Sequence, residues 1–230
     1  MNFQQTIESR RSVHQYSDEP LDDETLENIV SLATEAPSSY NLQPWEFLVV
    51  RDDDRLEQMR ECAYDQEHVT DAAATVAILG NKDPSAHAER VFADFLDKGY
   101  IPDEETKANL VETAEGMAEQ SEEERVRWTT NSTALAAMTL QYAAWDEGVA
   151  SCPMGGFDNE AVHETFDIPD DYEVVMLVSL GYPEDDAADL EKPQKFRRPT
   201  EEVLHFESFD PESGSVSESA TADGIAADDD

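Results

Sequence analysis

Six of the 15 Lys and Arg residues of this chain gather in two short stretches. The sequence holds 54 Asp and Glu residues against 15 Lys and Arg, a formal net charge of −39. Arg10 and Arg11 stand side by side in RRSVH, and four more cations fall in EKPQKFRRP, residues 191–199. Because the planar guanidinium fork matches a phosphate group, clustered cations in so acidic a chain indicate an anion site. Charge alone leaves an alternative open, in which these cations pair with neighbouring carboxylates.

Two further stretches have the composition of ligand-binding loops. Residues 36–45, APSSYNLQPW, lie between a predicted helix and a predicted strand and carry short donors and acceptors that suit a polar ring edge or a polyol: Ser38, Ser39, Asn41 and Gln43. Residues 151–158, SCPMGGFD, include Gly155 and Gly156, where a missing side chain lets backbone N–H groups approach a ligand closely. Taken singly, each stretch also has the composition of an ordinary loop without a ligand.

In order along the chain, four stretches resemble the nitroreductase family of FMN-dependent oxidoreductases. They are RRSVHQYSDEPLDDETLENIVSLATEAPSSYNLQPWEFLVV, AAWDEGVASCPMGGFD, VVMLVSLGYP and KFRRPTEEVLHFE. The match runs from about residue 8 to residue 207 and is loose over 83–127. The resemblance implies an α+β fold with a central, mostly antiparallel sheet flanked by helices, in an intertwined homodimer with flavin sites at the subunit interface.

The resemblance also implies a reaction. NADH or NADPH would pass a hydride through FMN to nitroaromatics, quinones or similar small-molecule acceptors, with the flavin carrying the chemistry and no catalytic side chain required. Two alternatives stay open. Relatives with this fold fragment their own flavin with oxygen or remove halide from aromatic rings, and a protein of this kind can bind FMN without turnover.

The resemblance assigns residues to each part of the flavin. The phosphate and the flavin edge would be held by Arg10, Arg11, Ser12, Lys195 and Arg197. His14 stands where the family usually has Arg or Lys, and it carries less charge at neutral pH. The opposite subunit would supply Pro37, Ser38, Ser39, Asn41 and Gln43. The ring would pack on Pro153, Met154, Gly155 and Gly156. In AYDQEHV, Gln66 and His68 would face the pyrimidine side, and Asp65 departs from the family pattern.

Hydrophobic periodicity and the residues that end helices and strands predict the elements that position these residues. A helix is predicted from Asp22 to Pro37, with Leu26, Ile29, Val30 and Ala33 on one stripe. Buried strands are predicted at 45–50, 74–80 and 172–183, and further helices at 52–64, 129–149 and 159–171. The remaining predictions are a helical excursion at 83–127, an extended arm at 200–209, a single domain over 1–209 and a disordered acidic tail at 210–230.

Composition restricts location and partners. A diffuse carboxylate surface repels nucleic acids, and it suits the salt-rich cytoplasm of a halophilic archaeon; the alternative is an ordinary acidic protein with a solvated surface. No apolar run is long enough to cross a bilayer, and the N-terminal residues lack the apolar core of a signal peptide, so a cytoplasmic protein is expected. Cys62 and Cys152 lie far apart in the sequence and show no metal-type spacing, so two free thiols and no metal site are expected; a disulfide between the two is the alternative.

Overall fold

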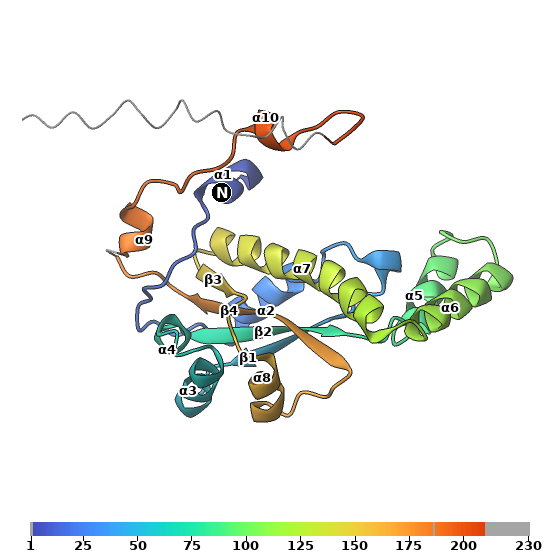
Figure 1. Cartoon of the computed structure of the whole chain (residues 1–230), viewed down its shortest axis with the longest axis horizontal. Coiled ribbons are helices and arrows are strands. Elements are labelled where there is room, and N and C mark those ends of the chain that lie inside the picture. The colour runs from blue at the N-terminus through green and yellow to red at the C-terminus, as the bar shows by residue number, and fades with distance from the viewer. Residues whose placement is uncertain (1, 186, 210–230) are drawn as a thin grey trace, which may run out of the picture. The chain divides into compact units, whose positions relative to one another are not determined.

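The computed structural model describes residues 2–185 and 187–209 (Figure 1). The chain divides after Glu191 into two units, which are described separately below. The first unit holds the whole sheet and the helices that pack on it. The second begins at Lys192. The predicted disordered tail at 210–230 lies outside the described residues.

The first unit is built on one antiparallel sheet in the order β1-β2-β4-β3. Its strands are β1 (Trp45–Val50), β2 (Ala74–Asn81), β3 (Ala150–Met154) and β4 (Tyr172–Gly181). The predicted antiparallel α+β architecture is confirmed, as are the three predicted strands. Strand β3 was not predicted. Residues 151–158 have the composition of a loop, but the first four of them belong to this strand.

Helices cover both faces of the sheet, which explains the unbroken apolar run in β2. Successive side chains of a strand point to opposite faces. Val76 and Ile78 pack against α2 (Asp23–Ala33) and α7 (Glu122–Asp146). Ala77 and Leu79 pack on the other face, against α3 (Asp53–Cys62) and α8 (Asn159–Thr165). In Figure 1 the two helix layers lie above and below the strands.

The long helix α7 starts earlier than predicted. It begins at Glu122 rather than 129, because Ser121 and Glu124 form a reciprocal capping box that satisfies two backbone N–H groups. It ends at Asp146, and Gly148 follows with φ of 79°. The predicted end at 149 is therefore too late in the chain.

The predicted helical excursion forms a separate small core. It contains α5 (Ala88–Asp97) and α6 (Glu104–Ala118), and their apolar faces enclose Phe92 and Ala114 together with Leu42 from the loop before β1. The two helices therefore tie the excursion to the loop that precedes β1.

Short helices complete the described chain. They are α1 (Phe3–Ser9), η1 (Ser39–Asn41), α4 (His68–Asp71), α9 (Ala188–Glu191) and α10 (Thr200–Val203). Because α10 is helical, the prediction of an extended arm over 200–209 is wrong for its first four residues. No helix in the described part of the chain is both long and apolar enough to span a bilayer.

Gly80 allows α7 to approach β2 closely, and this generates a stability prediction. A Cβ at Gly80 would lie 2.5 Å from Thr129 Oγ1 and 2.9 Å from Thr133 Oγ1. Gly80→Ala should therefore lower the free energy of unfolding by about 1–3 kcal/mol through overpacking. In Gly116→Ala, the matched control in α6, the new Cβ meets nothing within 4 Å, so stability should stay level or rise. Thermal melts of both variants test this, and an unaffected Gly80→Ala protein contradicts it.

The charge generates a second prediction. Raising KCl from 0.1 to 1 M shortens the screening length from about 10 Å to about 3 Å, which removes most repulsion among exposed carboxylates. With a net charge of −39, we expect the melting temperature to rise by about 10 °C or more over this range. Screening saturates, so most of the rise should occur below 1 M. A melting temperature that climbs evenly up to 3 M KCl, or does not move, contradicts charge screening as the cause.

Candidate functional site

The chain that follows α1 is bonded to the ends of two strands. Ser12 pairs in parallel with Ser151 of β3, and the Val13 backbone N–H donates to the Ser151 carbonyl at 3.1 Å. The Tyr16 hydroxyl donates to the Val13 carbonyl at 2.7 Å and lies 2.9 Å from Ser179 Oγ in β4. Residues 10–14 are thereby held along the outer edge of β3.

Arg11 is anchored at the end of α1. One terminal guanidinium nitrogen of Arg11 donates to the carbonyls of Glu8, Ser9 and Arg10 at 2.9, 2.9 and 3.1 Å. A helix C-terminus presents unpaired carbonyls and a partial negative charge, so a cation is favoured there. Arg10 and Arg11 are both half-buried. Backbone carbonyls thus hold the Arg11 side chain of the predicted basic pair.

The two glycines after β3 border open space. A Cβ at Gly155 or Gly156 would meet no atom within 4 Å. Gln66 Nε2 donates to the Gly156 carbonyl and to the Ala63 carbonyl, both at 2.8 Å, which ties the loop after α3 to the end of β3. The structure therefore brings together three predicted pieces: residues 10–14, Gln66 and residues 153–156. Their cations, amide and uncovered backbone suit a planar ring that carries a phosphate.

The predicted polar loop lies at the other side of the sheet. It leads into β1, and the strand order places β1 and β3 at opposite edges. The Ser39 N–H donates to Ser132 Oγ of α7 at 3.3 Å, and the Gln43 N–H donates to Ser38 Oγ at 3.0 Å. Asn41 and Gln43 have φ of 59° and 47°. Within one chain, Pro37, Ser38, Ser39, Asn41 and Gln43 are not brought to residues 10–14.

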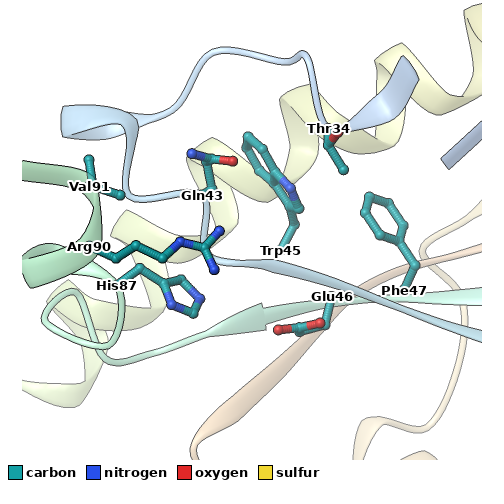
Figure 2. Close-up of a pocket in the computed structure, with 8 residues that line it drawn as sticks. All are labelled: Thr34, Gln43, Trp45, Glu46, Phe47, His87, Arg90 and Val91. Atoms are coloured by element: carbon teal, nitrogen blue, oxygen red, sulfur yellow. The ribbon is translucent and has the colours of Figure 1, made fainter. Parts of the chain in front are cut away.

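A pocket of about 280 Å³ opens beside this loop (Figure 2). Trp45 and Phe47 of β1 provide apolar walls, and Gln43 of the loop and His87 and Arg90 from the region of α5 also line the pocket. His87 and Arg90 belong to the excursion and were not among the predicted site residues. The pocket therefore combines the polar loop with the part of the chain that resembles the family least.

The second basic cluster belongs to the second unit. Arg197 donates from one guanidinium nitrogen to the carbonyls of Lys195 and Phe196, at 3.2 and 3.1 Å. Arg198 forms an ion pair with Glu202. Lys195 and Arg197 are exposed. Their place in a phosphate site stays a prediction.

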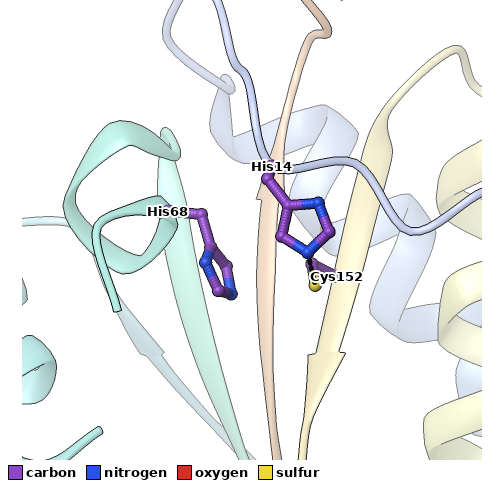
Figure 3. A group of neighbouring side chains, drawn as sticks. All are labelled: His14, His68 and Cys152. Atoms are coloured by element: carbon purple, nitrogen blue, oxygen red, sulfur yellow. Dashed lines mark hydrogen bonds between the residues drawn. The ribbon is translucent and has the colours of Figure 1, made fainter. Parts of the chain in front are cut away.

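Three side chains that are far apart in the sequence lie close together in the structure. His14, His68 of α4 and Cys152 of β3 each offer a ligand atom, and these atoms lie within 4.8 Å of one another (Figure 3). His14 Nε2 lies 3.5 Å from Cys152 Sγ. His14 Nδ1 lies 2.6 Å from Asp189 Oδ2 of α9. These three residues could hold a metal ion, whereas the expectation of no metal site stays a prediction.

Burial shapes the charge of this cluster. Desolvation lowers the pKa of His68, and the nearby His14 lowers that pKa further, so the neutral imidazole is favoured. Cys152 and Cys62 are each 5% exposed, and both carry thiols. Sequence spacing could not reveal the cluster, because its members are far apart along the chain and only the fold joins them.

Comparison with known proteins gives the same class of fold. The nitroreductase family model matches residues 7–182. YodC of Bacillus subtilis (strain 168), named provisionally as an NAD(P)H nitroreductase, is 37% identical over 78% of this chain and 89% of its own length. The NADH dehydrogenase of Thermus thermophilus is 31% identical over 76% of this chain and 83% of its own length.

A solved structure agrees with both relatives. A protein of Exiguobacterium sibiricum 255-15, described provisionally as a nitroreductase and crystallised in complex with FMN, superposes with a TM-score of 0.79. It is 26% identical, over 90% of this chain and 98% of that protein. Fold and sequence together define an α+β oxidoreductase. The chain belongs to the nitroreductase family.

Proposed function

We propose that this protein is an FMN-dependent oxidoreductase that passes a hydride from NADH or NADPH to nitroaromatics, quinones or similar acceptors. The observation that carries the proposal is the parallel pairing of Ser12 with Ser151, which sets the basic segment along β3, the strand that leads to the uncovered backbone of Gly155 and Gly156. FMN, when bound, supplies the acceptance and release of the hydride. The protein supplies the binding groups and their orientation.

The binding roles follow from chemistry at the β3 edge. Arg10, Arg11 and Ser12 would hold the phosphate, because guanidinium forks and a hydroxyl match its oxygens. Gly155 and Gly156 would present backbone N–H groups to the ring. The neighbouring Pro153 and Met154 would pack against its face, and Gln66, already bonded to Gly156, would hold the loop in place.

A second copy of the chain would complete the site. Pro37, Ser38, Ser39, Asn41 and Gln43 lie toward the β1 edge, whereas the other contacts lie at the β3 edge. A homodimer resolves this separation, because the loop of one subunit can reach the β3 edge of the other. Lys195 and Arg197 would complete the phosphate contacts, and residues 1–209 would act as one domain.

The excursion would select the acceptor. His87 and Arg90 border a pocket with Gln43, a residue that we assign to the flavin site. Side chains of α5 would then lie next to the site that the loop helps to form. The net charge of −39 supports function in a salt-rich cytoplasm, where screening relieves repulsion.

Reduction kinetics test the activity. In protein purified in concentrated KCl, we expect a flavin absorbance spectrum with one FMN per subunit. Anaerobic rapid mixing with NADH or NADPH should bleach that absorbance, and a nitroaromatic or quinone should restore it. A yellow protein whose absorbance neither nucleotide bleaches is an FMN-binding protein without this activity. A colourless protein that takes up no FMN in brine contradicts the proposal entirely.

Arginine variants test the phosphate contacts. Arg10→Ala and Arg197→Ala should each weaken FMN binding by about 10- to 100-fold, the effect of losing a charge-assisted hydrogen bond. Arg51→Ala is the control: it removes the same charge from an exposed ion pair with Asp23 and should leave FMN affinity unchanged. Fluorescence titration with FMN measures all three. Unchanged affinity in both test variants excludes the assigned contacts.

A further inference from the structure

We propose that His14, His68 and Cys152 form a binding site for one Zn²⁺ ion. The three residues come from the segment after α1, from α4 and from β3, and in Figure 3 their side chains converge. Imidazole nitrogen and thiolate sulfur are the ligands that zinc prefers in proteins. Three protein ligands leave a fourth tetrahedral position for a water molecule.

The distance between two of the ligand atoms fits tetrahedral zinc. With a Zn–N bond of about 2.0 Å and a Zn–S bond of about 2.3 Å, the nitrogen and sulfur lie about 3.5 Å apart at the tetrahedral angle. His14 Nε2 and Cys152 Sγ are 3.5 Å apart. All three ligand atoms lie within 4.8 Å of one another. A rotation of the His68 side chain would complete the shell.

Asp189 orients His14 as carboxylates orient metal-bound histidines. Its Oδ2 atom lies 2.6 Å from His14 Nδ1 and also accepts the His14 backbone N–H at 3.1 Å. A proton held on Nδ1 by the carboxylate leaves the lone pair of Nε2 directed at Cys152. This carboxylate–histidine–metal arrangement fixes the tautomer and the orientation of the imidazole ring.

His68 supplies an independent observation. Its Nε2 atom is buried and has no hydrogen-bond partner among the described residues. A buried polar atom without a partner costs free energy, which a metal ion or a metal-bound water would recover. The His68 ring stands edge-on to the His14 ring, with centroids 4.9 Å apart, so both imidazoles already border the same space.

The ligand atoms of this cluster differ in type from the carboxylate oxygens of the acidic surface. Mg²⁺ and Ca²⁺ take oxygen ligands, and they would bind diffusely to exposed carboxylates. In this cluster the carboxylate of Asp189 is bonded to His14, and the three offered ligands are two imidazoles and a thiol. The His14 side chain is 44% exposed, so an ion can enter from solvent, whereas Cys152 is buried.

The test is a Zn²⁺ titration of the full chain, freed of flavin and metal, in 2 M KCl with excess Mg²⁺ to saturate the carboxylates. Competition with a chromophoric chelator should give one Zn²⁺ per chain. Cys152→Ser and His68→Gln should each lower the affinity by about 100-fold or more, and Asp189→Asn by about 10- to 100-fold. Co²⁺ in place of Zn²⁺ should give thiolate-to-metal charge-transfer absorbance in the wild type, and Cys152→Ser should abolish it.

Cys62→Ser is the matched control. Cys62 is as buried as Cys152, and its sulfur contacts Thr165 Oγ1 at 3.5 Å where the ends of α3 and α8 meet. Its loss should leave Zn²⁺ affinity and the Co²⁺ spectrum unchanged. Circular dichroism and thermal melts of each variant confirm that it folds. A folded Cys152→Ser protein that keeps wild-type Zn²⁺ affinity overturns the site.

A second outcome also overturns it. If the wild type binds no Zn²⁺ while Cys152 is alkylated rapidly at neutral pH, the cluster is a thiolate–imidazolium pair oriented by Asp189. In that case His68→Gln should leave the alkylation rate unchanged, because His68 would have no part in activating the thiol.

The consequence for the flavin rests on the proposed function. His14 would serve both ligands, and Cys152 adjoins Pro153, which is assigned to the flavin ring, so saturating Zn²⁺ should weaken FMN binding by about 10-fold or more. If Zn²⁺ binds with the expected variant pattern and FMN affinity does not change, the metal site stands and the flavin assignment of His14 is wrong. If the Zn²⁺-free protein binds no FMN at all, the proposed function is wrong, and the result for the metal site is unaffected.

Discussion

The candidate site depends on the attachment of the extended segment from Ser12 to Tyr16 to strands from much later in the chain. Val13 is fully buried, and successive side chains of an extended chain point to opposite sides, so Ser12 and His14 face away from the core. Tyr16 fixes this register: burial raises the pKa of its hydroxyl, which stays protonated and donates to the Val13 carbonyl. Gly181 makes room for it, since a Cβ there would lie 2.9 Å from the Tyr16 ring.

The acidic composition is compatible with this fold because many carboxylates stabilise helix starts. Asp22 and Asp103 accept backbone N–H groups at the N-termini of α2 and α6, and these bonds lower the pKa of both carboxyls. The few cations are placed as specifically: Lys82 is nearly buried and pairs with Glu122, and Arg11 binds the last carbonyls of α1. The acidic excess is therefore a surface property, and the local bonds that define the fold do not oppose it.

Apolar runs revealed three of the four strands, because β1, β2 and β4 are long and rich in β-branched residues. Strand β3 was hidden because ASCPM has five residues, most of them small, and one is proline. The start of α7 was visible in principle: Ser121 and Glu124 have capping-box spacing, but the acidic turn after them has the same polar composition as the excursion. The candidate site residues also divide into those that the sequence reveals and those that it does not. Clustered Arg10 and Arg11 were found by adjacency, whereas residues joined only by tertiary structure, such as Asp189 with His14, left no pattern in the sequence.

His14 belongs to both proposed ligand sites, the FMN site and the Zn²⁺ site. A lysine or arginine at this position offers donors to an anion and has no lone pair for a metal ion. Histidine offers a donor when it is protonated and a metal ligand when it is neutral, and the bond from Nδ1 to Asp189 favours presenting Nε2 toward Cys152 in either state. The same carboxylate brings negative charge close to a position that a phosphate or an anionic ring would otherwise approach. In the proposed site, a histidine–aspartate pair therefore offers a metal ligand where a lysine or arginine would offer only donors, and Arg10 and Arg11 lie in the same segment of the chain.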